Sequence, residues 1–137
     1  MTAPGTEAPE TLPVRSEEDV VRVRQAVRAL VVRLKFSLVD QTKIVTAASE
    51  LARNTLVHGG GGETRLEIVH DGVRSGLKMT FEDQGPGILD IDRALRDGFT
   101  SGGGLGLGLG GSKRLVSELR IETEVGMGSR ITALKWK

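Results

Sequence analysis

The sequence predicts an α+β fold, a two-layer sandwich in which helices cover one face of a mixed, mainly antiparallel sheet. Three observations support this prediction. Two segments with apolar residues at helical spacing come first, and two segments of alternating polar and apolar residues follow them. A second alternating pair, separated by a short glycine-containing turn, ends the chain. The expected order is helix, helix, strand, strand, glycine-rich connection, helix, strand, strand.

Length and composition restrict the possible classes of protein. The chain has 137 residues, which fits one domain, and we expect that domain to span residues 16–137. Residues 1–15 hold three of the four prolines and are predicted to form a flexible tail. The formal net charge is only +1, so neither nucleic acid nor a membrane is expected as a partner. The chain has no cysteine and no apolar run of signal-peptide or membrane-spanning length, which favours a cytoplasmic protein.

Two helices are predicted in the first half of the chain. The first begins after Ser16, whose hydroxyl can cap the helix and whose three following residues are acidic. Its apolar residues recur at helical spacing, at Val20, Val23, Val27, Leu30 with Val31, and Leu34. The second helix is expected from about Leu38 or Val39 to a stop near His58, just before four consecutive glycines. Its buried stripe is predicted to be Ile44, Ala48, Leu51 and Thr55.

Strands and a third helix are predicted in the second half. Residues 65–68 and 77–82 alternate between polar and apolar, and the Asp71-Gly72 pair supplies a turn between them. Residues 88–99 are polar and only weakly helical, so this segment is expected to be mobile. The remaining elements are a helix at residues 112–119 and a hairpin of residues 121–125 and 130–136.

The first candidate site lies on the second helix. Glu50 and Asn54 are four residues apart, hence about 40° apart around the helix, and can contact the same ligand. Both flank the predicted apolar stripe, which places them at the edge of the core. A carboxylate there can accept a proton, and an amide oxygen one turn later can ligate Mg²⁺. The alternative is an ordinary solvated polar face.

The second candidate site follows the predicted strand that ends near Glu82. Gly85 and Gly87 allow the backbone to turn sharply and to approach a ligand closely. Asp83, at the end of the strand, offers an acceptor to a ligand amine such as the exocyclic amine of adenine. An ordinary Gly-Pro turn, with Asp83 as its local cap, is the alternative interpretation.

The third candidate site is a run of seven glycines between Gly102 and Gly111. Backbone N–H groups that lead into a helix beginning at Ser112 would bind phosphate, and Lys113 could add a positive charge. A flexible linker is the alternative, but three regularly spaced leucines within the run favour a loop that docks. The dinucleotide-binding pattern lacks a preceding strand here, and the Walker pattern fails because Lys113 follows a serine.

Taken in order, these three patches resemble the conserved boxes of the GHKL ATPase superfamily. The matching motifs are Glu50-x-x-x-Asn54, Asp83-x-Gly85-x-Gly87 and Gly104-Leu105-Gly106-Leu107-Gly108. Within the superfamily the chain resembles the RsbT-type switch kinases of bacterial stress signalling most closely, over roughly residues 14–137. That closer likeness rests on four segments, at residues 23–28, 38–42, 49–54 and 108–115.

The resemblance implies a Bergerat ATP-binding fold with ATP and Mg²⁺ as cofactors. It implies that Asn54 is the Mg²⁺ ligand, Glu50 the general base and Asp83 the adenine acceptor. Two further sets of residues would contact the nucleotide: Gly85 and Gly87 as the turn beneath it, and Gly104, Gly106 and Gly108 over its phosphates. Residues 89–101 would form a short lid. Arg53 could face a partner or a phosphate, or be a plain surface arginine. His58 could face phosphate, be a phosphoacceptor, or simply be a polar residue at the end of its helix.

By the same resemblance, the chain is expected to be a protein serine/threonine kinase that phosphorylates a STAS-domain antagonist. The freed kinase would then bind and activate a PP2C-type phosphatase, which would make it a partner switch in stress signalling. One alternative is an anti-sigma factor with the same kinase site, which binds an RNA polymerase sigma subunit. Another is a nucleotide-gated binding module that transfers nothing. The sequence leaves the oligomeric state open.

Overall fold

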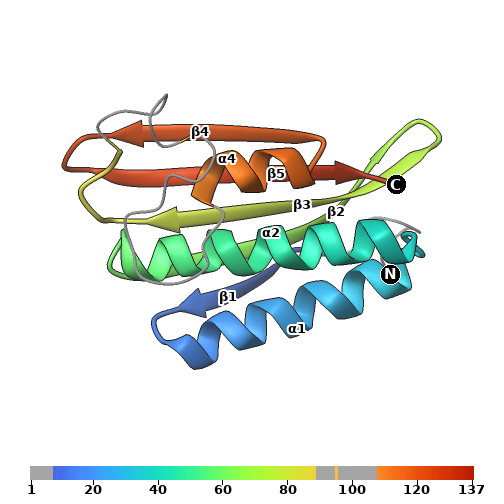
Figure 1. Ribbon diagram of the computed structural model, residues 1–137, viewed down its shortest axis with the longest axis horizontal. Helices are drawn as coiled ribbons and strands as arrows, with labels where there is room; N and C mark the ends of the chain where they lie inside the picture. The colour runs from blue at the N-terminus through green and yellow to red at the C-terminus, as the bar shows by residue number, and fades with distance from the viewer. Residues whose placement is uncertain (1–7, 89–94, 96–107) are drawn as a thin grey trace.

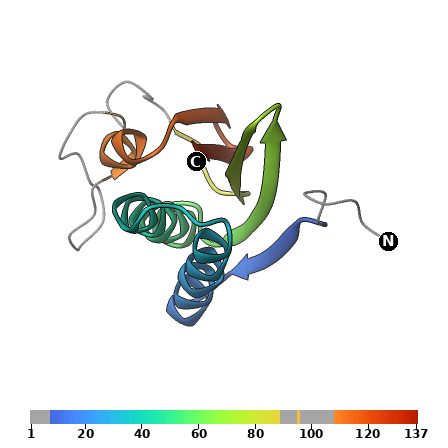
Figure 2. The same cartoon turned by 90° about the vertical axis from the view of Figure 1, so that its right-hand side faces the viewer.

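The computed structural model describes residues 8–88, 95 and 108–137. The described elements, in chain order, are β1 (Glu10–Val14), α1 (Glu17–Arg33), α2 (Leu38–Val57), β2 (Gly62–Asp71), β3 (Arg74–Asp83), α4 (Gly108–Leu115), β4 (Glu118–Glu124) and β5 (Gly128–Trp136). The three described helices lie on one side of the sheet, and none of the described elements covers its other face, called the open face below (Figures 1 and 2). The predicted two-layer α+β fold is therefore confirmed.

The sheet has five strands in the order β1-β2-β3-β5-β4. Each neighbouring pair is antiparallel, so the described strands include no parallel pair, although a mixed sheet was predicted. β5 lies between β3 and β4, and its register places Ser129 opposite Asp83 at the end of β3. On the other side of β3, Gly62 at the start of β2 also lies opposite Asp83.

The first two helices begin and end where their local sequence signals lie. Ser16 caps α1 by accepting the N–H of Asp19 at 3.2 Å, and Ser37 caps α2 in the same way. α1 ends in a tight turn in which Lys35 has a φ of 62° and the N–H of Phe36 bonds to the carbonyl of Val31 at 3.1 Å. This is the Schellman pattern, which satisfies carbonyls that a helix end leaves unpaired. The predicted starts of both helices and the predicted end of α2 near His58 are confirmed.

The core lies between the helices and the inner face of the sheet. Its largest fully buried apolar side chains come from α1, α2, β1, β2 and β3, and among them are Val14, Val23, Val27, Val31, Ile44, Leu51, Leu66, Leu77, Met79 and Phe81. All four residues of the predicted stripe on α2 are buried. Alternate residues of the strands point away from this core, and most of them are polar or charged.

The predicted flexible tail is wrong for Glu10–Val14, which form β1 at the edge of the sheet. Val14 is fully buried, and the strand pairs with β2, whose residues lie about fifty positions later in the chain. Pro13 is compatible with this position because an edge strand does not need every N–H for pairing. The start of the predicted tail, residues 1–7, lies outside the described residues.

The third helix begins and ends four residues earlier than predicted, at Gly108–Leu115 in place of 112–119. Leu109, Ser112 and Val116 are buried, and their spacing of three and four residues explains the shift, because it aligns one face of the helix with the core. Packing thus outweighs the low helix propensity of three glycines. Leu119, predicted to be in this helix, belongs to β4. Within the described part of the chain, no helix is both long and apolar enough to span a membrane.

Candidate functional site

Several segments that are far apart in sequence meet at one end of the molecule. α2 and β3 both end there, the β4–β5 turn lies beside them, and α4 begins toward the same end (left in Figure 1). The β2–β3 turn and the α1–α2 turn lie at the opposite end. The first and second candidate sites of the sequence therefore belong to one region.

Glu50 and Asn54 lie one turn apart on α2, and both are half-buried. They flank the buried positions Ala48, Leu51 and Ala52, which confirms the predicted place at the edge of the core. The backbone carbonyl of Asn54 accepts the N–H groups of His58 at 2.9 Å and Gly59 at 3.3 Å. Asn54 therefore lies in the last turn of the helix, directly before the chain passes to the next part of the site.

Gly59, just after α2, is pressed against the turn that follows β3. A Cβ on Gly59 would lie 2.6 Å from Oδ2 of Asp83, and a Cβ on Gly85 would lie 2.7 Å from the carbonyl oxygen of Gly59. Oδ1 of Asp83 accepts the N–H of Gly85 at 2.9 Å. The absence of side chains at these two glycines thus allows the Asp83 carboxylate to lie beside the end of the helix that carries Asn54.

The β4–β5 hairpin holds the other side of the same turn. The N–H of Gly126 donates to the carbonyl of Pro86 at 2.9 Å, and the N–H of Ile88 donates to Oγ1 of Thr123 at 2.8 Å. Gly87 has a φ of 79°, and a Cβ there would lie 2.7 Å from the carbonyl oxygen of Glu124. This contact between hairpin and turn was missed from the sequence, where its only signal is a hydroxyl residue shortly before the Gly126-Met127-Gly128 turn.

The third candidate site is only partly within the described residues. Gly104 and Gly106, and the predicted lid at 89–101 apart from residue 95, lie outside them. Gly108 is the first residue of α4, which packs against α2. The predicted helix start at Ser112 is wrong, because Ser112 is fully buried within α4. Lys113 lies in the last turn of α4, so it is not at the helix N-terminus where a phosphate would bind.

Arg53 and His58, whose roles the sequence left open, lie near the end of α2. The guanidinium Nη1 of Arg53 lies 3.4 Å from Oε1 of Glu17, at the start of α1, and both side chains are largely exposed. His58 is the C-cap residue of α2 and is exposed. Arg53 thus links the two helices at their surface.

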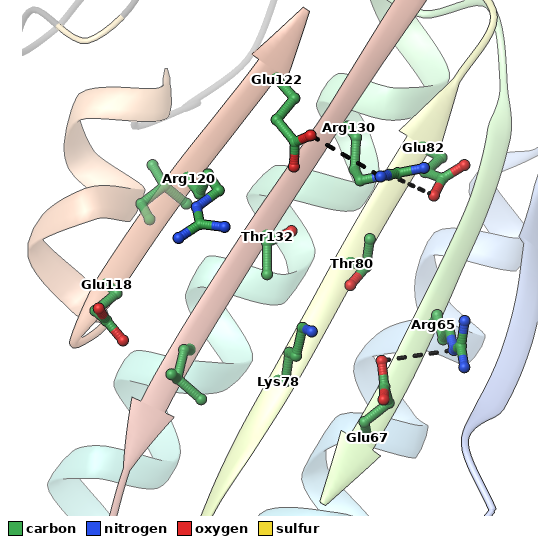
Figure 3. A pocket seen from close by; sticks show the side chains of 12 residues that line it. Arg65, Glu67, Lys78, Thr80, Glu82, Glu118, Arg120, Glu122, Arg130 and Thr132 are labelled. Carbon is green, nitrogen blue, oxygen red and sulfur yellow. Dashed lines mark hydrogen bonds and ion pairs between the residues drawn. The ribbon is translucent and has the colours of Figure 1, made fainter. Parts of the chain in front are cut away.

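A separate hollow of about 720 Å³ lies on the open face of the sheet. Charged and threonine side chains from β2, β3, β4 and β5 line it (Figure 3). Several of its charges are paired within the hollow: Nε of Arg130 lies 2.7 Å from Glu82, and Nε of Arg65 lies 3.5 Å from Glu67. None of the candidate site residues that the structure describes lines this hollow, so the hollow is distinct from the site at the end of α2.

The site offers few protein ligands for a metal ion. It therefore suits a metal that is held mainly by the oxygen atoms of a bound ligand. Among the described residues, no group of three or more His, Asp or Glu side chains could hold a metal ion. Mg²⁺ commonly binds through one or two protein oxygens together with phosphates and water. The half-buried amide of Asn54 fits that role because it lies at the edge of the core and not within it.

A family model described as "Histidine kinase-, DNA gyrase B-, and HSP90-like ATPase" matches residues 39–137. The matched range runs from α2 to the end of the sheet and so contains every segment of the site. The chain belongs to this family. The predicted GHKL membership is therefore confirmed.

Two relatives indicate which class of enzyme within this family the chain resembles. The chain is 46% identical to the serine/threonine-protein kinase RsbT of Bacillus subtilis, over 90% of this chain and 92% of the relative. It is 30% identical to the anti-sigma F factor of Geobacillus kaustophilus, over 85% of this chain and 83% of that protein. These likenesses confirm the prediction of an ATP-dependent enzyme of the serine/threonine protein kinase class, and they support a kinase that works by switching partners.

Solved structures share the fold. A crystal structure of the RsbU and RsbW domains of a Mycobacterium tuberculosis protein superposes with a TM-score of 0.62 at 21% identity. It covers 94% of this chain, which spans 32% of that longer one. The SiaB-SiaC complex of Pseudomonas aeruginosa gives a TM-score of 0.55 at 12% identity, with coverage of 97% and 91%. At these identities the likeness establishes the fold alone.

Proposed function

We propose that this chain transfers the γ-phosphoryl group of Mg²⁺-ATP to a serine or threonine of a STAS-domain antagonist protein. The observation that supports the proposal is the contact between Gly59, just after α2, and the Asp83-Gly85 turn, because α2 carries Glu50 and Asn54. The 46% identity to RsbT supports the choice of a hydroxyl acceptor on a protein.

Each site residue has one task in this proposal. Asp83 accepts the exocyclic amine of adenine, while Gly85 and Gly87 allow the backbone to lie beneath the base. Asn54 ligates Mg²⁺, and Glu50, one turn earlier on α2, accepts the proton of the acceptor hydroxyl. Gly104, Gly106 and Gly108 cover the phosphates. Residues 89–101 are proposed as the lid.

Little covalent chemistry is required of the protein. Mg²⁺ would neutralise phosphate charge, and the remaining acceleration comes from positioning. Asn54 fixes the metal-bearing end of the nucleotide, and Asp83 fixes the base end. Glu50 holds the acceptor hydroxyl and takes its proton as the hydroxyl oxygen bonds to the γ-phosphorus. The bond from that phosphorus to the β–γ bridging oxygen breaks in the same step, and ADP is the leaving group.

The proposed output is a partner switch. After phosphorylating its antagonist, the chain would bind and activate a PP2C-type phosphatase in a bacterial stress response within the cytoplasm. The likeness to the anti-sigma F factor favours a second candidate function, in which the same kinase binds an RNA polymerase sigma subunit. Co-purification from the native host separates the two, because one outcome recovers a phosphatase and the other a sigma subunit.

Phosphoryl transfer tests the proposal directly. The purified chain is incubated with radiolabelled ATP, Mg²⁺ and the STAS-domain protein encoded in the same genome, and the modified residue is mapped. Labelled serine or threonine is expected. If the chain binds ATP but labels no protein under these conditions, it is a nucleotide-gated binding module and the proposed kinase function is wrong.

Glu50→Gln separates chemistry from binding. Glutamine keeps the shape of the side chain but cannot take a proton, so the single-turnover transfer rate should fall by roughly 10²–10⁴-fold. ATP affinity, measured by calorimetry on the same sample, should change little. A Gln variant that transfers at the wild-type rate would remove Glu50 from the mechanism.

Asn54→Ala tests the metal ligand. The alanine variant should keep its fold, because Asn54 is half-buried at the edge of the core. Removing one protein oxygen from the metal should abolish most of the increase in ATP affinity that Mg²⁺ gives. Calorimetry with and without Mg²⁺ measures this increase. An unchanged dependence on Mg²⁺ would exclude Asn54 as a ligand.

A further inference from the structure

The hydroxyl of Thr123 lies where three parts of the site meet. Thr123 is near the end of β4, and its Oγ1 accepts the N–H of Ile88, at the end of the Asp83-to-Ile88 turn, at 2.8 Å. The same oxygen lies 3.3 Å from the carbonyl of Gly128 and 3.1 Å from Oγ of Ser129. Ser129 is the residue of β5 that lies opposite Asp83.

These contacts use the full hydrogen-bonding capacity of a hydroxyl. A hydroxyl has one proton and two lone pairs. One lone pair accepts the N–H of Ile88, the hydroxyl can donate its proton to the carbonyl of Gly128, and Oγ of Ser129 lies at hydrogen-bonding distance, where either oxygen can be the donor. One side-chain oxygen thus connects residues that are 35 positions apart in the chain, at 88 and 123. The bond from Gly126 to Pro86, by contrast, joins two backbone atoms.

The turn that Thr123 holds carries Asp83 at its start. A second hydrogen bond between this turn and the hairpin runs from the N–H of Gly126 to the carbonyl of Pro86, at 2.9 Å. Gly87 lies between these two bonds, with a φ of 79° and no room for a side chain against Glu124. If the bond at Ile88 is lost, residues 84–88 keep the bond from Gly126 to Pro86, while Asp83 itself stays paired with Ser129 in the sheet. Because the N–H of Gly85 bonds to Oδ1 of Asp83, movement of Gly85 away from the hairpin would change the orientation of the Asp83 carboxylate beside the end of α2.

We propose that Thr123 is a positioning residue of the nucleotide site, whose hydroxyl holds the Asp83-to-Ile88 turn on the hairpin and thereby fixes Asp83 where it meets the base. This inference rests on the proposed role of Asp83 in binding ATP. Thr123 itself touches no nucleotide, and it acts through the backbone of Ile88 and through Ser129.

The test compares three variants of the full chain. Thr123→Val keeps the shape but removes the hydroxyl, and Thr123→Ser keeps the hydroxyl. Thr132→Val is the matched control, because Thr132 lies on β5 and faces the hollow on the open side of the sheet (Figure 3). Calorimetry gives the affinities for Mg²⁺-ATP and Mg²⁺-GTP, and hydrogen exchange in the nucleotide-free protein gives the opening of the Ile88 amide.

Thr123→Val is expected to weaken ATP binding by about tenfold, as the loss of one or two hydrogen bonds implies, and to reduce the preference for ATP over GTP. The Ile88 amide should exchange about tenfold faster, while core amides of β3 stay protected. Thr123→Ser should bind ATP and exchange the Ile88 amide as the wild type does. Thr132→Val should change neither the ATP affinity nor the exchange rate of the Ile88 amide.

The outcomes also separate this inference from the proposed function. A folded Thr123→Val variant that binds ATP like the wild type overturns the inference and leaves the kinase function intact. Equal loss of ATP affinity in Thr132→Val would assign the effect to general weakening of the sheet, which also overturns it. A wild-type chain that binds ATP but transfers no phosphate refutes the kinase function alone, whereas one that binds no ATP refutes both.

Discussion

The two ends of the sheet use sharp turns for different purposes. At the far end, Gly72 between β2 and β3 has a φ of 59° and no atom within 4 Å of the position of a Cβ. At the site end, Gly85 and Gly87 would each place a Cβ 2.7 Å from a backbone oxygen. The glycine at the far end serves only the backbone conformation, whereas those at the site end also allow neighbouring segments to approach closely. Close approach of this kind is what a ligand-binding turn requires.

Among the substitutions that test this difference, Gly85→Ala should have the largest effect on stability and on ATP binding. Its Cβ would contact the backbone of Gly59, which cannot move away without shifting the end of α2. We expect the free energy of unfolding to fall by about 3 kcal/mol, as for an overpacked site, and ATP binding to be lost. Urea unfolding and calorimetry measure the two effects.

Gly72→Ala is the control for this prediction. Alanine at a φ of 59° is strained but meets no neighbouring atom, so it should destabilise by only about 1 kcal/mol. ATP affinity should not change, because the β2–β3 turn lies at the other end of the molecule (Figure 1). If both variants lose equal stability and both bind ATP, the two ends do not differ as proposed.

Sequence signals close together in the chain predicted the two long helices and both hairpins. Ser16 and Ser37 cap their helices through residues three positions later, and the Asp71-Gly72 turn joins adjacent strands. β1 was missed because its partner strand is remote in sequence, and a Pro-containing segment of five residues carries no clear alternation. α4 was misplaced because local propensity disfavours glycine, while the burial of Leu109 and Ser112 decides where the helix lies.

The candidate site was predicted in part for the same reason. The spacing of Glu50 and Asn54 follows from helix geometry alone, and the structure confirms that they share the edge of the core. The contact of Gly59 with Asp83 joins two segments through tertiary packing, which no local pattern records. The bond from Ile88 to Thr123 is of the same kind. The assigned roles of these residues stay predictions, as do those of Gly104 and Gly106.

Asp83→Asn tests the site end of the sheet by another route. It replaces a carboxylate by an amide and leaves the shape of the side chain unchanged. Asparagine can still accept the N–H of Gly85 through its carbonyl oxygen, so the turn should keep its conformation. Its amide group offers a donor where adenine also presents a donor. ATP affinity should therefore fall by roughly tenfold or more, and wild-type protein should bind GTP far more weakly than ATP.

Calorimetry with both nucleotides on the two proteins checks this expectation, and thermal unfolding without nucleotide serves as the control for structure. A variant with unchanged stability but weaker ATP binding supports a direct contact between Asp83 and the base. Equal affinity of the wild type for ATP and GTP would remove Asp83 as the group that selects adenine.

Lys35→Gly should have the smallest effect on the free energy of unfolding, and it should raise that free energy where the glycine-to-alanine substitutions lower it. Lys35 ends α1 at the far end of the molecule with a φ of 62°, a conformation that disfavours residues with a Cβ. Glycine adopts it readily and would keep the backbone bonds from residues 35 and 36 to Val32 and Val31. Greater freedom of glycine in the unfolded chain offsets part of this gain, so stability should rise by about 0.5 kcal/mol. ATP affinity should not change, since this turn and the ends of α2 and β3 lie at opposite ends of the molecule (Figure 1). A loss of stability would show that the exposed lysine side chain contributes more than its backbone strain costs, and that the far end also depends on more than conformation.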